Sequence, residues 1–150
     1  MKRRVLALAG LLLAASAWSQ VTVTDAWVRA TVAQQKATGA FMHLAARSDM
    51  KLVAARSPVA GTVEIHEMAM QDNVMRMRPV PFLGLPAGQD VALRPGSFHV
   101  MLLDLQQQIQ AGDAVPLTLV LERPDGQREE LQVQATARAQ RHALASSMET

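Results

Sequence analysis

The sequence predicts an all-β protein, an antiparallel sandwich or barrel built from short strands. Apolar and polar residues alternate in short runs, which is the pattern of a strand with one face on a core. Turn-forming residues, chiefly Gly, Pro, Asp and Asn, separate these runs at intervals that suit hairpins. Beyond the N-terminal segment, no long stretch has the helical apolar period of about 3.6 residues. A helical bundle and a doubly wound α/β sheet are therefore not expected.

The expected strands follow one another from residue 21 onward. The alternation occupies residues 21–28, 40–44, 62–70, 98–103, 115–121 and 131–133. Expected turns fall at residues 58–61, 72–73, 84–88, 94–97, 112–113 and 124–126. Pro95 followed by Gly96 suits a type II turn, because proline presets the first central φ angle and glycine accepts a positive φ at the second. Asp125 followed by Gly126 is a strong hairpin signal.

The N-terminal segment has the organisation of a secretory signal peptide. Three cationic residues at positions 2–4 precede an apolar run at 5–15, and small residues follow up to position 19. A membrane-spanning helix needs about 20 apolar residues, more than this run supplies. We therefore expect residues 1–19 to direct export to the periplasm and to be removed, with no stable membrane span. A β-domain at 20–136 and a flexible tail at 137–150 complete the expected organisation.

The composition excludes several kinds of partner and site. Without the three N-terminal cations the net charge of +2 becomes −1, and only 3% of the residues are aromatic. A nucleic-acid partner is not expected, because no basic stripe with interleaved aromatic residues remains. The chain contains no cysteine. It therefore has neither a disulfide framework nor a thiolate that could act as nucleophile or metal ligand.

Methionines are concentrated in one part of the chain. Five of the nine lie between residues 66 and 101, a stretch that also contains His66 and His99. Methionine is a common, flexible filler of hydrophobic cores, so packing is one interpretation of this cluster. Strand parity favours a second interpretation, that the cluster binds a metal, because residues two apart project from the same face of a strand. His99 and Met101 share one face, and the apolar residues at 98, 100 and 102 form the other.

Whether Met77 joins this group depends on the turn that precedes it. In the strand at 62–70, His66 lies on the face opposite the aliphatic residues, and Met68 shares that face. A two-residue turn at 72–73 places Met77 opposite Met68, whereas a three-residue loop at 71–73 turns it to the other side of the sheet. We favour the two-residue turn, because Asp and Asn tolerate its backbone conformation.

Two imidazoles and two thioethers form a donor set that favours Cu(I). Soft sulfur ligands select Cu(I), whereas Zn²⁺ prefers thiolate, imidazole or carboxylate ligands. A blue-copper electron-transfer site needs a cysteine thiolate, which this chain lacks. Neutral ligands also hold Cu(I) less tightly than thiolates do, which suits a protein that passes copper on.

The spacing of the four residues resembles the motif of the periplasmic copper chaperones called PCu(A)C. That motif is His, ten residues, Met, twenty-one residues, His, one residue, Met, and the chain matches it with His66, Met77, His99 and Met101. The resemblance extends over about residues 21–133, where recurrent segments of the family are matched at 25–29, 38–42, 66–68, 74–79 and 115–119.

The resemblance implies a fold, a metal and a role. The fold is a cupredoxin-like, antiparallel Greek-key sandwich or barrel, and the metal is Cu(I), bound by His66, Met77, His99 and Met101. The role is to carry copper to the assembly of cytochrome c oxidase, with the oxidase copper domain or a thioredoxin-like Sco protein as acceptor.

Several other histidine, methionine and tryptophan residues lie outside the four-residue motif. Met68 is a neighbour or substitute of the ligands, and the tail residues His142 and Met148 are too few to assign to a copper site. We interpret His43 as a structural or surface residue. Trp27 is interpreted as a core anchor of the first strand.

Three alternatives to a copper carrier make different demands on the sequence. Catalysis is not expected, because Ser97 and His99 share a strand face that Asp104 does not, and sequence proximity is not triad geometry. A periplasmic copper store used for resistance would have the same ligands as a chaperone. A β-sandwich binding module, in which the methionines only pack, would bind no metal.

Overall fold

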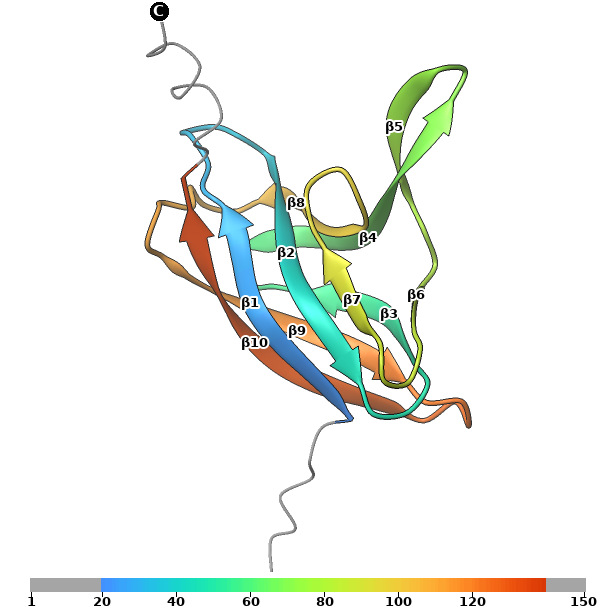
Figure 1. Cartoon of the computed structure of the whole chain (residues 1–150). Helices are drawn as coiled ribbons and strands as arrows, with labels where there is room; N and C mark the ends of the chain where they lie inside the picture. Colours follow the sequence, from blue (N-terminus) through green and yellow to red (C-terminus); the bar gives the residue numbers. More distant parts are fainter. Residues whose placement is uncertain (1–19, 140–150) are drawn as a thin grey trace, which may run out of the picture.

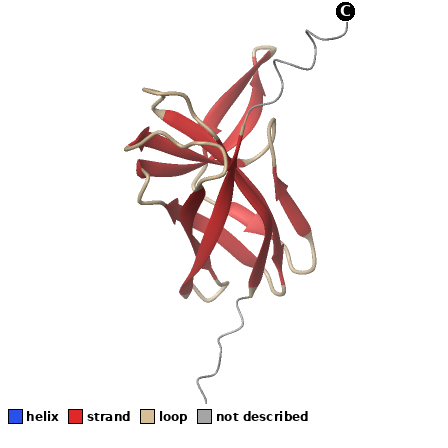
Figure 2. Cartoon of the chain, turned by 90° about the vertical axis from the view of Figure 1, so that its left-hand side faces the viewer, coloured by secondary structure: helices blue, strands red, loops and turns tan. Residues whose placement is uncertain are grey.

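The computed structural model describes residues 20–139, and every regular element within them is a β-strand. Figures 1 and 2 show this all-β architecture, which confirms the predicted fold class. The strands are β1 (Val21–Arg29), β2 (Ala37–Ala46), β3 (Met50–Arg56), β4 (Ala60–Gln71), β5 (Val74–Pro79), β6 (Leu83–Leu85), β7 (Asp90–Leu93), β8 (His99–Leu105), β9 (Ala114–Glu122) and β10 (Arg128–Arg138). Among these residues there is no helix of the length and apolarity needed to cross a membrane.

Three of the expected boundaries need correction, and one of them is the turn expected at 58–61, which ends too late because β4 begins at Ala60. The expected tail at 137–150 starts too early, because β10 continues to Arg138 and Ala137 is only 3% exposed. The expected turn at 84–88 also starts too early, since Gly84 lies in β6 and pairs with Lys51 of β3. The strands β3, β6 and β7 were not expected from the sequence pattern. The expected signal peptide at 1–19 and the tail beyond residue 139 lie outside the described residues.

All ten strands belong to one curled sheet. Its order is β5-β4-β8-β2-β1-β10-β9-β3-β6, and β7 pairs with β2. Every pairing is antiparallel except that of β1 with β10, which is parallel. The first and last strands of the domain run the same way, and the rest of the domain forms the connection between them, so this one pair is parallel. Figure 1 shows β1 and β2 passing in front of β3 and β9, so the curled sheet forms two layers.

Aliphatic side chains fill the space between these layers. Val115, Leu117, Leu119 and Leu121 alternate along β9, and each is at most 1% exposed. The interpretation of Trp27 as a core anchor is wrong, because its side chain is only partly buried. Its register with β2 shifts between residues 24 and 27, and this bulge turns Val28, which is 0% exposed, toward the core instead.

The hairpin of β4 and β5 has the predicted two-residue turn. Asp72 and Asn73 have φ angles of 52° and 62°, which is the left-handed conformation that a type I′ turn requires at both central positions. The register that follows pairs Met68 with Met77. The hairpin extends away from the body of the sheet (Figure 1), and β5 pairs with β4 alone. The β4–β5 hairpin therefore has one end in solvent, and its strand β4 pairs with β8 in the body of the sheet.

A second predicted turn connects β7 to β8. Gly96 has a φ angle of 85°, and the Ser97 backbone N–H donates a hydrogen bond of 3.0 Å to the Arg94 carbonyl. This is the geometry expected for a type II turn at Pro95 and Gly96. The turn sets the start of β8, and His99 is the first residue of that strand.

Candidate metal centre

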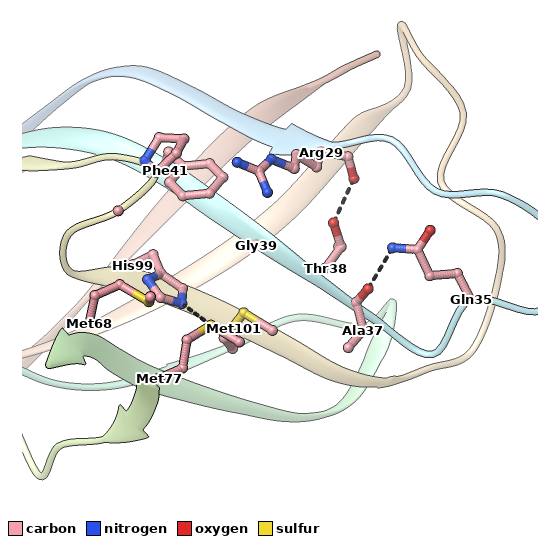
Figure 3. Close-up of a pocket in the computed structure, with 12 residues that line it drawn as sticks. Arg29, Gln35, Ala37, Thr38, Gly39, Phe41, Met68, Met77, His99 and Met101 are labelled. Carbon is pink, nitrogen blue, oxygen red and sulfur yellow. Dashed lines mark hydrogen bonds between the residues drawn. The ribbon is translucent and has the colours of Figure 1, made fainter. Parts of the chain in front are cut away.

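A pocket of about 360 Å³ lies where β2, β8 and the β4–β5 hairpin meet. Three of the four predicted ligands line it, namely Met77, His99 and Met101, and Met68 lines it as well. Figure 3 shows these four side chains gathered on one side of the pocket, with Phe41 and Arg29 on the other side. The fourth predicted ligand, His66, is not among the pocket-lining residues and is described below.

His99 is more deeply buried than the three methionines that line the pocket with it. It is 4% exposed, and its Nδ1 lies 2.9 Å from the backbone carbonyl oxygen of Ser97. A carbonyl oxygen can only accept a hydrogen bond, so Nδ1 carries the proton and donates it. In the neutral ring this leaves the lone pair on Nε2, which lies 3.2 Å from the Sδ atom of Met77 (Figure 3). A nitrogen and a sulfur donor therefore face each other.

The neutral form of His99 is also the favoured one. Burial of the ring lowers the pKa of His99 below its usual value, and the neighbouring His66 ring and Arg29 guanidinium lower it further. The hydrogen bond to the Ser97 carbonyl raises the pKa but does not offset these effects. In the neutral ring no proton lies between Nε2 and the thioether, so both atoms are free to bind a shared metal ion.

His66 lies beside His99 on the neighbouring strand. The two residues are direct partners in the β4–β8 register, and their ring centroids are 5.8 Å apart. His66 is 8% exposed, and its Nε2 lies 2.6 Å from Oε2 of Glu64. The His66 Nδ1 is buried and has no hydrogen-bond partner within the described part of the chain.

This orphaned nitrogen identifies which atom of His66 can bind a metal. The Glu64 carboxylate accepts, so Nε2 carries the proton, and the lone pair of the neutral ring is left on Nδ1. Leaving a buried polar atom without a partner costs about 1–3 kcal/mol. A cation bound at Nδ1 removes that cost. His66 thus offers Nδ1, whereas His99 offers Nε2.

Met101 and Met77 reach the pocket from different strands. Met101 follows His99 by two residues on β8 and is partly buried, and Val100 between them is 0% exposed on the opposite face, as strand parity predicts. Met77 comes from the exposed strand β5 and is 53% exposed. The pocket therefore combines a buried imidazole with a thioether that solvent can reach.

An aromatic wall from β2 closes the other side of the pocket. Gly39 has no side chain, and a Cβ atom placed there would lie 2.9 Å from Cζ of Phe41, so a larger residue would push this ring out of its position. The Phe41 ring stacks on Trp27 at 4.6 Å between centroids, and the Arg29 guanidinium lies 5.2 Å from the Phe41 centroid. Sequence reasoning missed Glu64 and this wall. Strand parity could have identified Glu64, because it lies two residues before His66 on the same strand face.

The remaining candidates lie away from the pocket or make other contacts. His43 on β2 is paired with Asp90, with 3.2 Å between Nδ1 and Oδ2. The contact of His99 with Ser97 is to the backbone carbonyl oxygen and not to the side-chain hydroxyl, so it does not activate that hydroxyl as a nucleophile. Between residues 20 and 139 no three His, Cys, Asp or Glu side chains are grouped so that they could hold a metal ion.

Comparison with known proteins identifies related sequences. A family model described as "Putative lipoprotein LpqE-like" matches residues 21–136. A relative named "Putative lipoprotein Lxx21020", from Leifsonia xyli subsp. xyli (strain CTCB07), is 28% identical over 100 residues, or 66% of this chain. The chain matches 60% of the length of that relative.

Solved structures with the same fold include domains named PCuAC. The apo PCuAC domain from PmoF1 is 26% identical, with a TM-score of 0.64 over 81% of this chain and 95% of that domain. The apo form of DR1885 from Deinococcus radiodurans is 30% identical, with a TM-score of 0.61 over 83% of each chain. Its Cu(I) form is 29% identical, with a TM-score of 0.61 over 83% of this chain and 81% of that one. These similarities confirm the predicted cupredoxin-like fold class.

Proposed function

This chain belongs to the LpqE-like family, and we propose that it is an exported copper chaperone that binds one Cu(I) ion through His66, Met77, His99 and Met101. The structures that resemble it include a PCuAC domain and the Cu(I) form of DR1885, which supports copper as the cargo. The lipoprotein names of the family and of the relative support export, and we propose the periplasm as the location. The ion is carried and no reaction is catalysed.

The observation that carries this proposal is the contact between His99 and Met77. Their Nε2 and Sδ atoms lie 3.2 Å apart, and burial keeps His99 in its neutral form. The buried Nδ1 of His66 on the adjacent strand and the thioether of Met101 in the same pocket supply two more lone pairs. Four neutral donors, two of them soft sulfur atoms, suit Cu(I) better than Zn²⁺ or Mg²⁺.

The exposure of the ligands suits release as well as binding. Met77 is 53% exposed on an edge strand, so an acceptor protein can approach this ligand without unfolding the core. We propose that the acceptor is the copper domain of cytochrome c oxidase or a Sco protein. A periplasmic copper store used for resistance is the second candidate, because neutral ligands serve storage equally well.

Copper binding is tested by competition with a Cu(I)-specific chelator under anaerobic conditions. The proposal predicts one tightly held Cu(I) per chain and a large loss of affinity in the variants His99→Gln and Met101→Leu. The matched controls are His43→Gln, which changes a histidine paired with Asp90, and Met50→Leu, which changes a core methionine. Equal affinities in the wild type and in His99→Gln, with circular dichroism showing both folded, would contradict the proposed ligands.

Delivery is tested separately with the loaded protein. Cu(I)-loaded protein is mixed with an apo oxidase copper domain or an apo Sco protein, and copper transfer is followed by separating the two proteins. Free Cu(I) buffered by the chelator is the control. A chaperone transfers its copper faster than the buffered ion does, whereas retention of the copper would identify a store.

A further inference from the structure

One face of the β4–β5 hairpin carries a series of methionines. Met68 pairs with Met77, and Met70 pairs with Met75, in adjacent positions of the same antiparallel ladder. Residues two apart lie on the same face, so all four side chains share it. We call Met68 and Met77 the inner pair, because both line the pocket, and Met70 and Met75 the outer pair, because they lie nearer the turn.

Packing does not explain the outer pair. Two other methionines, Met42 and Met50, fill the core and are 1% and 3% exposed, as expected for flexible fillers. Met70 and Met75 are 66% and 47% exposed, in an arm whose strand β5 is exposed along its whole length. Side chains this exposed add little hydrophobic free energy to folding, and methionine is not a strong strand former.

The two pairs form a continuous line of thioethers between solvent and the pocket. Successive residues on one strand face are about 6.6 Å apart along the strand, so the outer pair is one step beyond the inner pair. Met77 of the inner pair reaches His99 directly, since its Sδ atom lies 3.2 Å from His99 Nε2. The hairpin arm projects from the sheet (Figure 1), which places the outer pair at its free end.

We propose that Met70 and Met75 form a second, weaker Cu(I) site that loads and unloads the pocket. The inference rests on the proposed function, because it assumes that the pocket binds Cu(I). Two neutral thioethers in water bind Cu(I) more weakly than two thioethers with two imidazoles, so copper moves inward down an affinity gradient. Each step is a ligand exchange: a new Cu–S or Cu–N bond forms as an outer Cu–S bond breaks. Copper stays in the +1 state, and neither electron nor proton is transferred.

Occupancy of the outer pair is tested by NMR with Ag(I), a redox-stable probe for Cu(I) sites. Protein labelled with ¹³C at the methionine methyl groups is titrated. The first equivalent is expected to shift the Met77 and Met101 signals, and further Ag(I) the Met70 and Met75 signals. The core methionines Met42 and Met50 serve as internal controls. If the outer pair shifts no more than the controls at several equivalents, the second site does not exist.

The role of the outer pair in loading is tested by stopped-flow transfer of Cu(I) from a chelator. The double variant Met70→Leu/Met75→Leu keeps the apolar surface and removes both sulfur atoms. We expect its loading rate to fall about tenfold, within the range over which association rates vary among related variants, while the equilibrium affinity of the pocket is unchanged. The matched control is Val74→Leu, which alters an exposed residue (50%) on the opposite face of the hairpin.

The outcomes separate this inference from the proposed function. Slower loading with an unchanged pocket affinity supports the outer site. Unchanged loading in the double variant, with a tight site still present, overturns the outer site alone. Absence of any tight Cu(I) site in the wild type overturns both the proposed function and this inference.

Discussion

The β9–β10 hairpin and the β4–β5 hairpin have the same alternating pattern, but they differ in the type and the burial of the alternating residues. In β9 the inward residues are aliphatic and at most 1% exposed, and neighbouring strands flank the hairpin on both sides. In the β4–β5 hairpin the alternate residues are methionines, and β5 lies at the edge of the sheet. Alternation in the first hairpin makes a core. In the second hairpin it places sulfur and nitrogen atoms on one face, so residue type distinguishes a core face from the face of the proposed metal site.

The largest expected effect on stability comes from the aliphatic hairpin. Leu119→Ala removes a fully buried side chain of β9, and we expect the free energy of unfolding to fall by about 2–5 kcal/mol. Chemical denaturation measures this loss. The Cu(I) affinity of the folded variant should stay at the wild-type value, and a parallel loss of affinity would show that the two regions are not independent.

An intermediate effect is expected at Glu64, which we assign as a positioning residue for His66. Its carboxylate accepts a hydrogen bond from Nε2 at 2.6 Å and so leaves Nδ1 free. Groups that orient a metal-bound histidine change metal affinity by about 10–100-fold when removed. Glu64→Ala should therefore weaken Cu(I) binding by about this factor.

Two further measurements distinguish positioning from general structural damage at Glu64. Glu64→Gln retains a carbonyl oxygen that can accept from Nε2, so it should restore most of the affinity that Glu64→Ala loses. Long-range ¹H–¹⁵N NMR spectra report which ring nitrogen carries the proton. Protonation of His66 at Nδ1 in the wild-type apo protein would contradict the assignment.

The smallest effect is expected at the tip of the methionine hairpin. Met75→Leu changes an exposed side chain (47%), so the free energy of unfolding should change by less than about 0.5 kcal/mol. The affinity of the pocket for Cu(I) should also be unchanged. A loss of several kcal/mol on thermal or chemical denaturation would show that this residue packs, which would remove the contrast between the two hairpins.

Strand parity and turn chemistry were sufficient to predict much of the fold and part of the site. The pairing of Met68 with Met77 followed from a two-residue turn at Asp72 and Asn73, and the structure has this turn. The placement of Met101 on the face of His99, away from Val100, followed from parity alone. Local rules work here because each feature lies within one strand or one hairpin.

Features that depend on distant strands or on irregular backbone were not predictable in this way. The wall of the pocket joins Gly39 and Phe41 of β2 to Arg29 of β1, and no spacing rule relates these residues to His99. Trp27 was misplaced because a bulge in β1 reverses the parity that the rest of the strand follows. The tautomers of the two histidines likewise depend on hydrogen bonds that the sequence does not specify.

X-ray absorption at the copper K-edge of the loaded protein tests the central claim most directly. One Cu(I) per chain should be surrounded by both nitrogen and sulfur neighbours, with imidazole scattering from His66 and His99 and sulfur scattering from Met77 and Met101. In Met77→Leu/Met101→Leu the mixed nitrogen and sulfur shell of the wild type should no longer form at one Cu(I) per chain. A wild-type copper shell without sulfur, or a nitrogen and sulfur shell unchanged in this double variant, would contradict the account.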